Sequence, residues 1–421
     1  MHRAAVLLIG GVLAGSLLGC SSDSSQEAAF GDRAAPSAPT APAAGSAARA
    51  PAAPGDPITA DGVREHLEVL ASDLLQGRLA GTTGERRAGE YIRAVLESID
   101  GLQPGGDGGT WFQDFTFQRW LATLPSRNVI ALLPGSDPEL AGETIVIGAH
   151  YDHEGPGGGQ IFNGADDNAS GSATLLEIAA ALASRPERPR RTLAFHWYGA
   201  EESGLLGSAY YVSHPLRPLA GTVMMLNLDM VGRLRGHALM VGATGTSPLF
   251  PRLLPGLCRR EGLVMKEEPR VSSNSDHWSF FRQKVPVLFL FTGFHGDYHK
   301  VSDEAVRVNV QGAASIGALA EDIVLAVDGL DADERPEFTP SARGKEHWVP
   351  RAMLGLTMQG QTTLVGRTGG RREESPLVIA EIEPGGPAER AGLRVGDELL
   401  AVDGASATGL ATLQAALVLR G

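Results

Sequence analysis

Four short apolar runs recur in the middle of the chain, and each has the length of a buried β-strand. They are separated by segments whose apolar residues repeat at helical spacing. Such alternation predicts an α/β fold, in which a mostly parallel, partly mixed sheet is flanked by helices. The four runs are residues 144–149, 193–198, 223–228 and 285–291.

The same periodicities place the remaining elements of this fold. A further strand is expected at 128–133, before the four runs. The expected helices are 61–75, 86–99, 170–184, 207–213, 247–260 and 310–327.

The chain has 421 residues, which is more than one ordinary domain needs. Its formal charge of -13, with no long basic run, argues against nucleic acid as a partner. Composition shifts divide the chain into five segments. These are an export signal at 1–20, an Ala/Pro/Ser-rich disordered tether at 21–57, the α/β domain at 58–330, a linker at 331–346 and a smaller unit at 347–421.

The first twenty residues have the pattern of an export signal, with Arg3 before the apolar stretch 4–18. Leu17-Leu18-Gly19-Cys20 resembles a bacterial lipobox, which implies cleavage before Cys20 and a lipid anchor on that residue. We therefore expect a lipoprotein of the cell envelope, on the periplasmic side or at the cell surface. An ordinary cleaved signal is the alternative. Cys258 then has no disulfide partner and is expected to be a buried small hydrophobe.

The smaller unit resembles PDZ domains. Residues 384–393 and 395–404 match the middle of such domains, and Leu354-Gly355-Leu356 resembles their carboxylate-binding loop. The resemblance implies a β-rich domain that binds chain ends or a partner protein. Further strand sequence normally follows the helix expected at 410–419, so we expect either a missing last strand or a chain that continues.

Polar residues follow the apolar runs. The carboxyl ends of the strands form the ligand crevice of an open α/β sheet, so residues that are distant in sequence can converge there. The candidates, which could hold metal or move protons, are His150, Asp167, Glu201, Glu202, Asp229 and His299.

Each of these motifs also has a structural interpretation. A histidine at a strand end is often only structural, but in His150-Tyr151-Asp152 the carboxylate of Asp152 could orient a metal-bound imidazole. Asp166 and Asp167 could cap the following helix, or one of them could bridge two cations. Glu201-Glu202 could be a surface pair, although its position after a buried strand favours a site. Neither His153 nor Asp166 is assigned a ligand role.

Taken in order, these motifs resemble the dizinc aminopeptidases of the bacterial leucyl aminopeptidase and glutamate carboxypeptidase type. The likeness extends from about residue 70 to residue 303, and includes Gly77-Arg78. It implies the fold of the zinc exopeptidases, two zinc ions (cobalt or manganese could replace them) and a peptide substrate. The implied ligands are His150 and Asp229 for one ion, Glu202 and His299 for the other, and Asp167 as the bridge.

The resemblance also implies a mechanism. Glu201 is the general base toward a hydroxide that bridges the metals, Asp152 supports His150, and Tyr298 stabilises the oxyanion, although Tyr298 could equally belong to the core. The segment 275–278 resembles one near the substrate pocket of the family.

The expected activity is removal of N-terminal residues from peptides. Carboxypeptidase and glutaminyl cyclase activities remain alternatives on the same metal core, although the cyclases typically have Trp where this chain has Tyr298. A metal-stabilised PDZ-type binding protein without catalysis is the non-enzyme alternative. The presence of Glu201 argues against it, because a structural metal site needs no free base.

Overall fold

The computed structural model describes residues 4–7, 58–119, 122–340, 356–359, 377–382, 394–402 and 405–406. They belong to two compact units, a larger one within residues 51–353 and a smaller one that contains the C-terminal strands. The lipobox, the tether, the motif at 384–393 and the helix expected at 410–419 lie outside the described residues.

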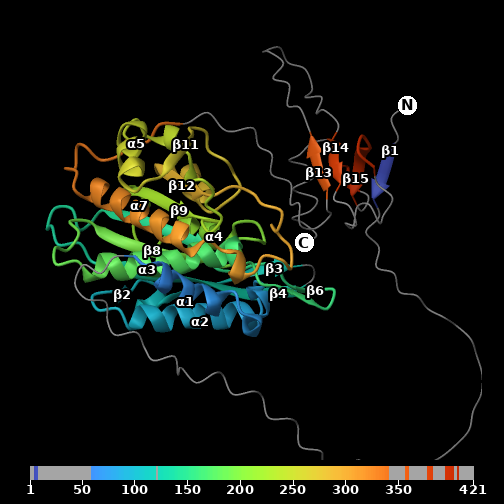
Figure 1. Cartoon of the computed structure of the whole chain (residues 1–421), viewed down its shortest axis with the longest axis horizontal. Coiled ribbons are helices and arrows are strands. Elements are labelled where there is room, and N and C mark those ends of the chain that lie inside the picture. The colour runs from blue at the N-terminus through green and yellow to red at the C-terminus, as the bar shows by residue number, and fades with distance from the viewer. Residues whose placement is uncertain are drawn as a thin grey trace, which may run out of the picture. The chain divides into compact units, whose positions relative to one another are not determined.

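The larger unit is built on a mixed sheet (Figure 1). Its strand order is β11-β10-β12-β9-β5-β8-β4-β2, with β3 paired to β4. The central strands β8, β5, β9 and β12 are parallel, whereas β4 pairs with β8 and β10 pairs with β12 in antiparallel fashion. The bounds are β2 Gln103–Pro104, β3 Phe112–Arg119, β4 Ala122–Leu133, β5 Thr144–His150, β8 Thr192–Tyr198, β9 Thr222–Leu228, β10 Ala238–Gly242, β11 Val264–Glu268 and β12 Val287–Phe291.

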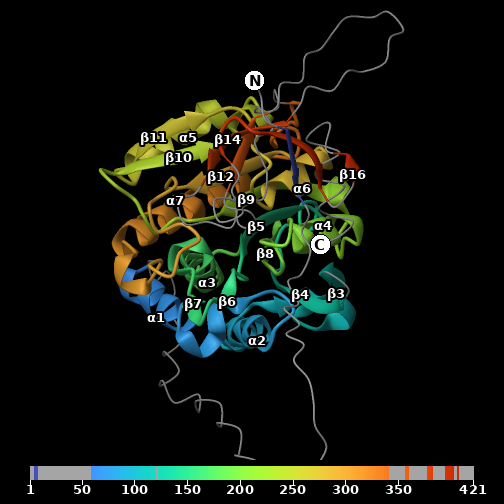
Figure 2. The same cartoon turned by 90° about the vertical axis from the view of Figure 1, so that its right-hand side faces the viewer.

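Helices cover both faces of this sheet (Figure 2). Alternate residues of β5 divide between the faces, because Ile145 and Ile147 join the core under α1, α2, α3, α5 and α7, while Val146 joins the core under α4 and α6. The bounds are α1 Ala60–Leu70, α2 Thr83–Glu97, α3 Gly171–Ser184, α4 Leu206–Ser213, α5 Phe250–Arg260, α6 His277–Arg282 and α7 Val310–Asp328. The expected mixed α/β sheet flanked by helices is confirmed.

Shorter elements complete the unit. A small hairpin of β6 (Gly155–Gly157) and β7 (Gln160–Phe162) follows β5. Short helical turns are η1 Asp73–Arg78, η2 Asp107–Gly109, η3 Ala165–Ser170, η4 Leu219–Gly221, η5 Thr244–Thr246 and η6 Ala305–Arg307. Among the described helices, α7 alone is long and apolar enough to cross a membrane, but it packs on α1 and α3 in the core. Cys258 is buried, as expected.

The smaller unit contains a second sheet. Its strands are β1 Ala4–Leu7, β13 Leu356–Gln359, β14 Leu377–Ile382, β15 Glu398–Val402 and β16 Ala405–Ser406. β14 pairs antiparallel with β13 and β15, and β16 pairs antiparallel with β15. β1, which lies in the expected export signal, pairs parallel with β15.

A buried carboxyl group joins α2 to the sheet. Glu85 accepts hydrogen bonds from the amide of Gly81 (2.6 Å) and the hydroxyl of Ser126, and only 3% of the residue is exposed. Burial, with a smaller contribution from Asp152, raises its pKa from 4.5 to about 8. Since the folded-state pKa is raised, the neutral form contributes stability below about pH 4.5 that is lost as the pH rises through about 8.

We therefore expect Glu85→Gln to match the wild type in stability at pH 5 and to exceed it at pH 9 by at least about 1 kcal/mol, because glutamine stays neutral. Urea unfolding at both pH values would measure this. The matched control is the exposed residue Glu139, where Glu139→Gln should change neither value. A Glu85→Gln variant that is less stable than the wild type at pH 9 would contradict the prediction.

Candidate metal centre

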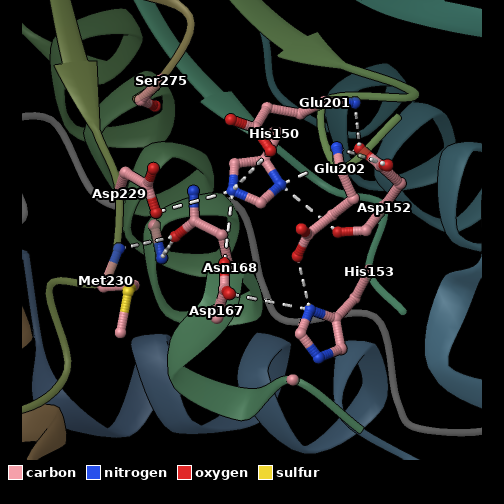
Figure 3. A network of polar contacts seen from close by, with 12 residues as sticks. His150, Asp152, His153, Asp167, Asn168, Glu201, Glu202, Asp229, Met230 and Ser275 are labelled. Carbon is pink, nitrogen blue, oxygen red and sulfur yellow. Dashed lines mark hydrogen bonds and ion pairs between the residues drawn. The ribbon is translucent and has the colours of Figure 1, made fainter. Parts of the chain in front are cut away.

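Asp167 lies at the centre of the site. Its Oδ1 is 3.4 Å from Nε2 of His150, and its Oδ2 is 2.9 Å from Nε2 of His299. The side chain is almost fully buried, and each oxygen faces a different imidazole (Figure 3 shows His150 and Asp167). A carboxylate in this arrangement can hold two cations side by side.

One side of Asp167, here called the first half-site, is formed by His150 and Asp229. They end or follow the neighbouring parallel strands β5 and β9. Nε2 of His150 is 3.5 Å from Oδ1 of Asp229. Glu201, after β8, places its Oε2 4.0 Å from the same nitrogen.

The other side, the second half-site, is formed by Glu202 and His299. Glu202 comes from the turn after β8, and His299 comes from the loop after β12. Oε2 of Glu202 is 3.4 Å from Nε2 of His299. The structure thus brings all six residues selected from the sequence to one place.

The donor set fits a pair of metal ions. Imidazole nitrogens and carboxylate oxygens suit zinc. Oδ1 of Asp229 and Nε2 of His299 are buried, and within the described part of the chain neither makes a hydrogen bond of good geometry. Each nevertheless lies at ion-pair distance from another member of the cluster, so a cation could satisfy both.

The electrostatics separate the ligands from the candidate base. Burial opposes ionisation of Asp167, but His150 and His299 outweigh it, so its pKa lies well below the ordinary value. The pKa of Glu202 is lowered to about 2, because His299 outweighs burial there. Glu201 differs, because burial, reinforced by Glu202, raises its pKa well above the ordinary value. A buried carboxyl group with a raised pKa is suited to accepting and returning a proton.

Asp152 lies beside His150, as expected, and it also contacts the turn that carries the two glutamates. Its carboxylate is 3.8 Å from Nδ1 of His150, and that nitrogen is closer, at 3.3 Å, to the backbone carbonyl of Asp152. In addition, the carboxylate oxygens accept the backbone N–H groups of Glu201 (2.9 Å) and Glu202 (3.3 Å). Asp152 therefore anchors the turn that carries both glutamates.

Asp166 and Tyr298 flank the cluster. Asp166 accepts from the amide of Gly232 (2.6 Å) and the hydroxyl of Ser170 (3.0 Å), so it braces the loop and not the metal site. Tyr298 stacks on the ring of His299 with centroids 3.8 Å apart and packs against the cluster of Met230, Phe289 and Phe291.

The segment 275–278 lies behind the site. The hydroxyl of Ser275 accepts from the Asn227 side chain (2.7 Å), and His277 stacks on Phe289. Asp276 is fully buried, and burial raises its pKa to about 7.

Several residues that hold the site together were not assigned roles from the sequence. His153 and Glu154 contact Glu202 and His299. Asp303 accepts the backbone N–H groups of Asp166 (2.8 Å) and Asp167 (3.1 Å). Position could have indicated His153 and Glu154, because they directly follow His150-Tyr151-Asp152.

Arg78 is a fully buried support of the same site. Its guanidinium donates to the carbonyls of Leu70, Tyr151, Asn163 (2.7 Å) and Gly164 (3.0 Å). It thereby joins the loop after β5 to the loop before Asp167. Burial lowers its pKa to about 10, against the effect of nearby carboxylates, so Arg78 is charged at neutral pH.

Two parts of the chain match known protein families. Residues 128–324 match the model of peptidase family M28, and residues 349–421 match that of the PDZ domain. The chain is 32% identical over 247 residues to leupeptin-inactivating enzyme 1 of Streptomyces exfoliatus, covering 58% of this chain and 51% of that protein. It is 31% identical over 240 residues to an aminopeptidase of Pseudomonas aeruginosa, covering 51% and 42%. The chain spans about half the length of the curated relatives it matches.

Solved structures share the fold. BSAP, a zinc aminopeptidase from Bacillus subtilis, aligns with a TM-score of 0.52 at 16% identity, covering 68% of this chain and 99% of that one. The LapA aminopeptidase of Legionella pneumophila aligns with a TM-score of 0.51 at 21% identity, covering 64% and 72%.

We expect Arg78→Leu to destabilise the larger unit by about 3 kcal/mol or more, since several buried carbonyls would lose their donor. Urea unfolding followed by circular dichroism would measure the change. Arg87→Leu, at an exposed position of α2, is the matched control and should change stability by less than about 0.5 kcal/mol. Equal effects of the two substitutions would show that Arg78 is not a central support.

Proposed function

We propose that the protein is a zinc-dependent aminopeptidase that hydrolyses N-terminal residues from peptides, because residues 128–324 match the model of peptidase family M28. The observation that carries the proposal is the position of Asp167 between two half-sites, with Glu201 beside the first. Relatives named as aminopeptidases support the same conclusion.

The two half-sites would each hold one zinc ion. His150 and Asp229 would bind the first ion, and Glu202 and His299 would bind the second. Asp167 would contribute to the binding of both ions. When bound, the ions would supply Lewis acidity toward the scissile carbonyl and toward the attacking water.

The remaining chemistry belongs to the side chains. Glu201 would take a proton from the attacking water and return it to the leaving amine, for which its raised pKa is suited. Asp152 would keep Glu201 in place through the backbone N–H that it accepts. Tyr298, stacked on His299, would be placed to steady the oxyanion.

We further propose that the chain is exported and tethered to the cell envelope by a lipid on Cys20. The PDZ domain would recruit chain ends of substrates or a partner protein to the enzyme. The lipobox pattern and the apolar leader support the first proposal, and the match to the PDZ model supports the second.

Glu201→Gln should lower kcat on an aminoacyl p-nitroanilide by about 100- to 10,000-fold while two zinc ions per chain remain bound, because glutamine cannot carry the proton. Steady-state kinetics and elemental analysis would measure both. Glu139→Gln, at an exposed position, should retain full activity. Full activity of Glu201→Gln would remove this residue from the mechanism.

The choice of substrate separates the alternatives. An aminopeptidase cleaves a peptide with a free N-terminus and not its N-acetylated form. A carboxypeptidase would cleave the free and the N-acetylated peptide alike, from the C-terminus. A glutaminyl cyclase would act on a third substrate, a peptide with an N-terminal glutamine. Inactivity of the zinc-loaded protein on all three substrates would favour a binding protein.

Cys20→Ser should release the protein from the membrane fraction of a bacterial host and abolish incorporation of labelled palmitate. Cys258→Ser is the matched control, because Cys258 is buried in the larger unit and should leave membrane attachment unchanged. Continued incorporation of palmitate by Cys20→Ser would exclude this residue as the anchor.

A further inference from the structure

Two residues after β5, His153 and Glu154, contact side chains of the second half-site. His153 is fully buried, and its Nδ1 is 2.9 Å from Oε1 of Glu202 (Figure 3). An ionised carboxylate can only accept, so this contact requires the proton of His153 on Nδ1. The hydrogen bond uses one oxygen of Glu202, and the other, Oε2, faces His299 at 3.4 Å.

Glu154, the next residue, contacts the other ligand of the second half-site. Its Oε1 is 3.2 Å from Nδ1 of His299. When Glu154 accepts the proton on Nδ1, the lone pair of His299 stays on Nε2, the nitrogen that is 2.9 Å from Oδ2 of Asp167. This is the arrangement of carboxylate, histidine and metal that orients a ligand and raises its basicity.

The backbone holds this pair of residues firmly. The N–H of His153 donates to the carbonyl of Arg78 (3.3 Å), and His153 forms a bridge with Leu79. His153 also meets the ring of His299 edge-on, with centroids 5.6 Å apart. The segment is thus tied to the buried arginine that supports the site.

The two half-sites differ in this respect. Glu202 and His299, the two ligands that belong only to the second half-site, each have a side-chain partner. Glu202 contacts His153, and His299 contacts Glu154. In the first half-site, Nδ1 of His150 lies closer to a backbone carbonyl (3.3 Å) than to a carboxylate (3.8 Å).

We propose that His153 and Glu154 are positioning residues that set the affinity of the second half-site for its metal ion, and leave the first half-site largely unaffected. The inference rests on the proposed two-metal function, because it assigns these residues to ligands of that centre. Neither residue needs to touch the metal or the substrate. His153 fixes Glu202, and Glu154 fixes both the tautomer and the orientation of His299.

The test measures zinc directly. Wild-type protein and the variants Glu154→Ala and His153→Phe would be dialysed against a series of zinc buffers, and bound zinc per chain would be determined by elemental analysis. We expect the wild type to bind two ions, and the variants to bind the second about 10- to 100-fold more weakly while the first is unchanged. Circular dichroism would show that each variant is folded.

Conservative variants separate positioning from packing. Glu154→Gln retains an acceptor oxygen, and His153→Asn retains an N–H donor near the place of Nδ1, so both should recover most of the affinity of the second half-site. Glu139→Ala and His214→Phe, at exposed positions, are the matched controls and should bind two ions as the wild type does.

The outcomes are distinguishable from failure of the proposed function. A wild-type protein that binds no zinc would overturn the two-metal proposal itself. If the wild type binds two ions, then equal loss of both ions, or no loss, in Glu154→Ala and His153→Phe would overturn the positioning inference. Failure of His153→Asn to recover affinity, with a changed absorption spectrum of cobalt in the second half-site, would identify His153 as a direct ligand and overturn its positioning role.

Discussion

The structure depends on the burial of one carboxylate between two imidazoles. Asp167 is almost fully buried, and its oxygens face His150 and His299 at 3.4 and 2.9 Å. Glu202 and Asp229 add further negative charge close by, and ionised carboxylates are costly to bury without positive partners. A pair of divalent cations would supply those partners. The loops therefore form a framework that keeps these negative groups together.

Two buried groups make that framework rigid. The guanidinium of Arg78 donates hydrogen bonds to backbone carbonyls of the loops on both sides of the site. The carboxylate of Asp303 accepts hydrogen bonds from the backbone N–H groups of Asp166 and Asp167, and it also pairs with Arg233 at 2.8 Å. Both act on backbone groups, so they fix the path of the chain and leave the ligand side chains free to face the centre. The parallel strands β8, β5, β9 and β12 bring those loops to the same edge of the sheet.

The sequence predicted the parts of this arrangement that depend on periodicity. The apolar run 144–149 and the following His150 indicated both the strand β5 and its ligand, because a buried strand leaves a continuous apolar signal. The hairpin of β3 and β4 was not predicted over 112–119, although residues there alternate in burial. The positions of His153 and Glu154 after His150 could have indicated that they lie near the site. Their partners could not be predicted, because the direction of their side chains depends on how Arg78 and Leu79 fix the backbone. The hydrogen bonds of Asp152 to the backbone of Glu201 and Glu202 could not be predicted for the same reason.

The placement of Asp152 suggests how the site keeps a base free among its ligands. Its carboxylate accepts the amides of both Glu201 and Glu202, so it fixes the backbone of the turn without using either glutamate side chain. Glu202 is then held by His153, whereas Glu201 lies 4.0 Å from His150 and has a pKa raised chiefly by burial. Two chemically identical neighbours thus acquire different properties. One is ionised and suited to a ligand role, because two imidazoles, those of His153 and His299, lie close to it. The other binds a proton more tightly, because burial outweighs the influence of the more distant His150.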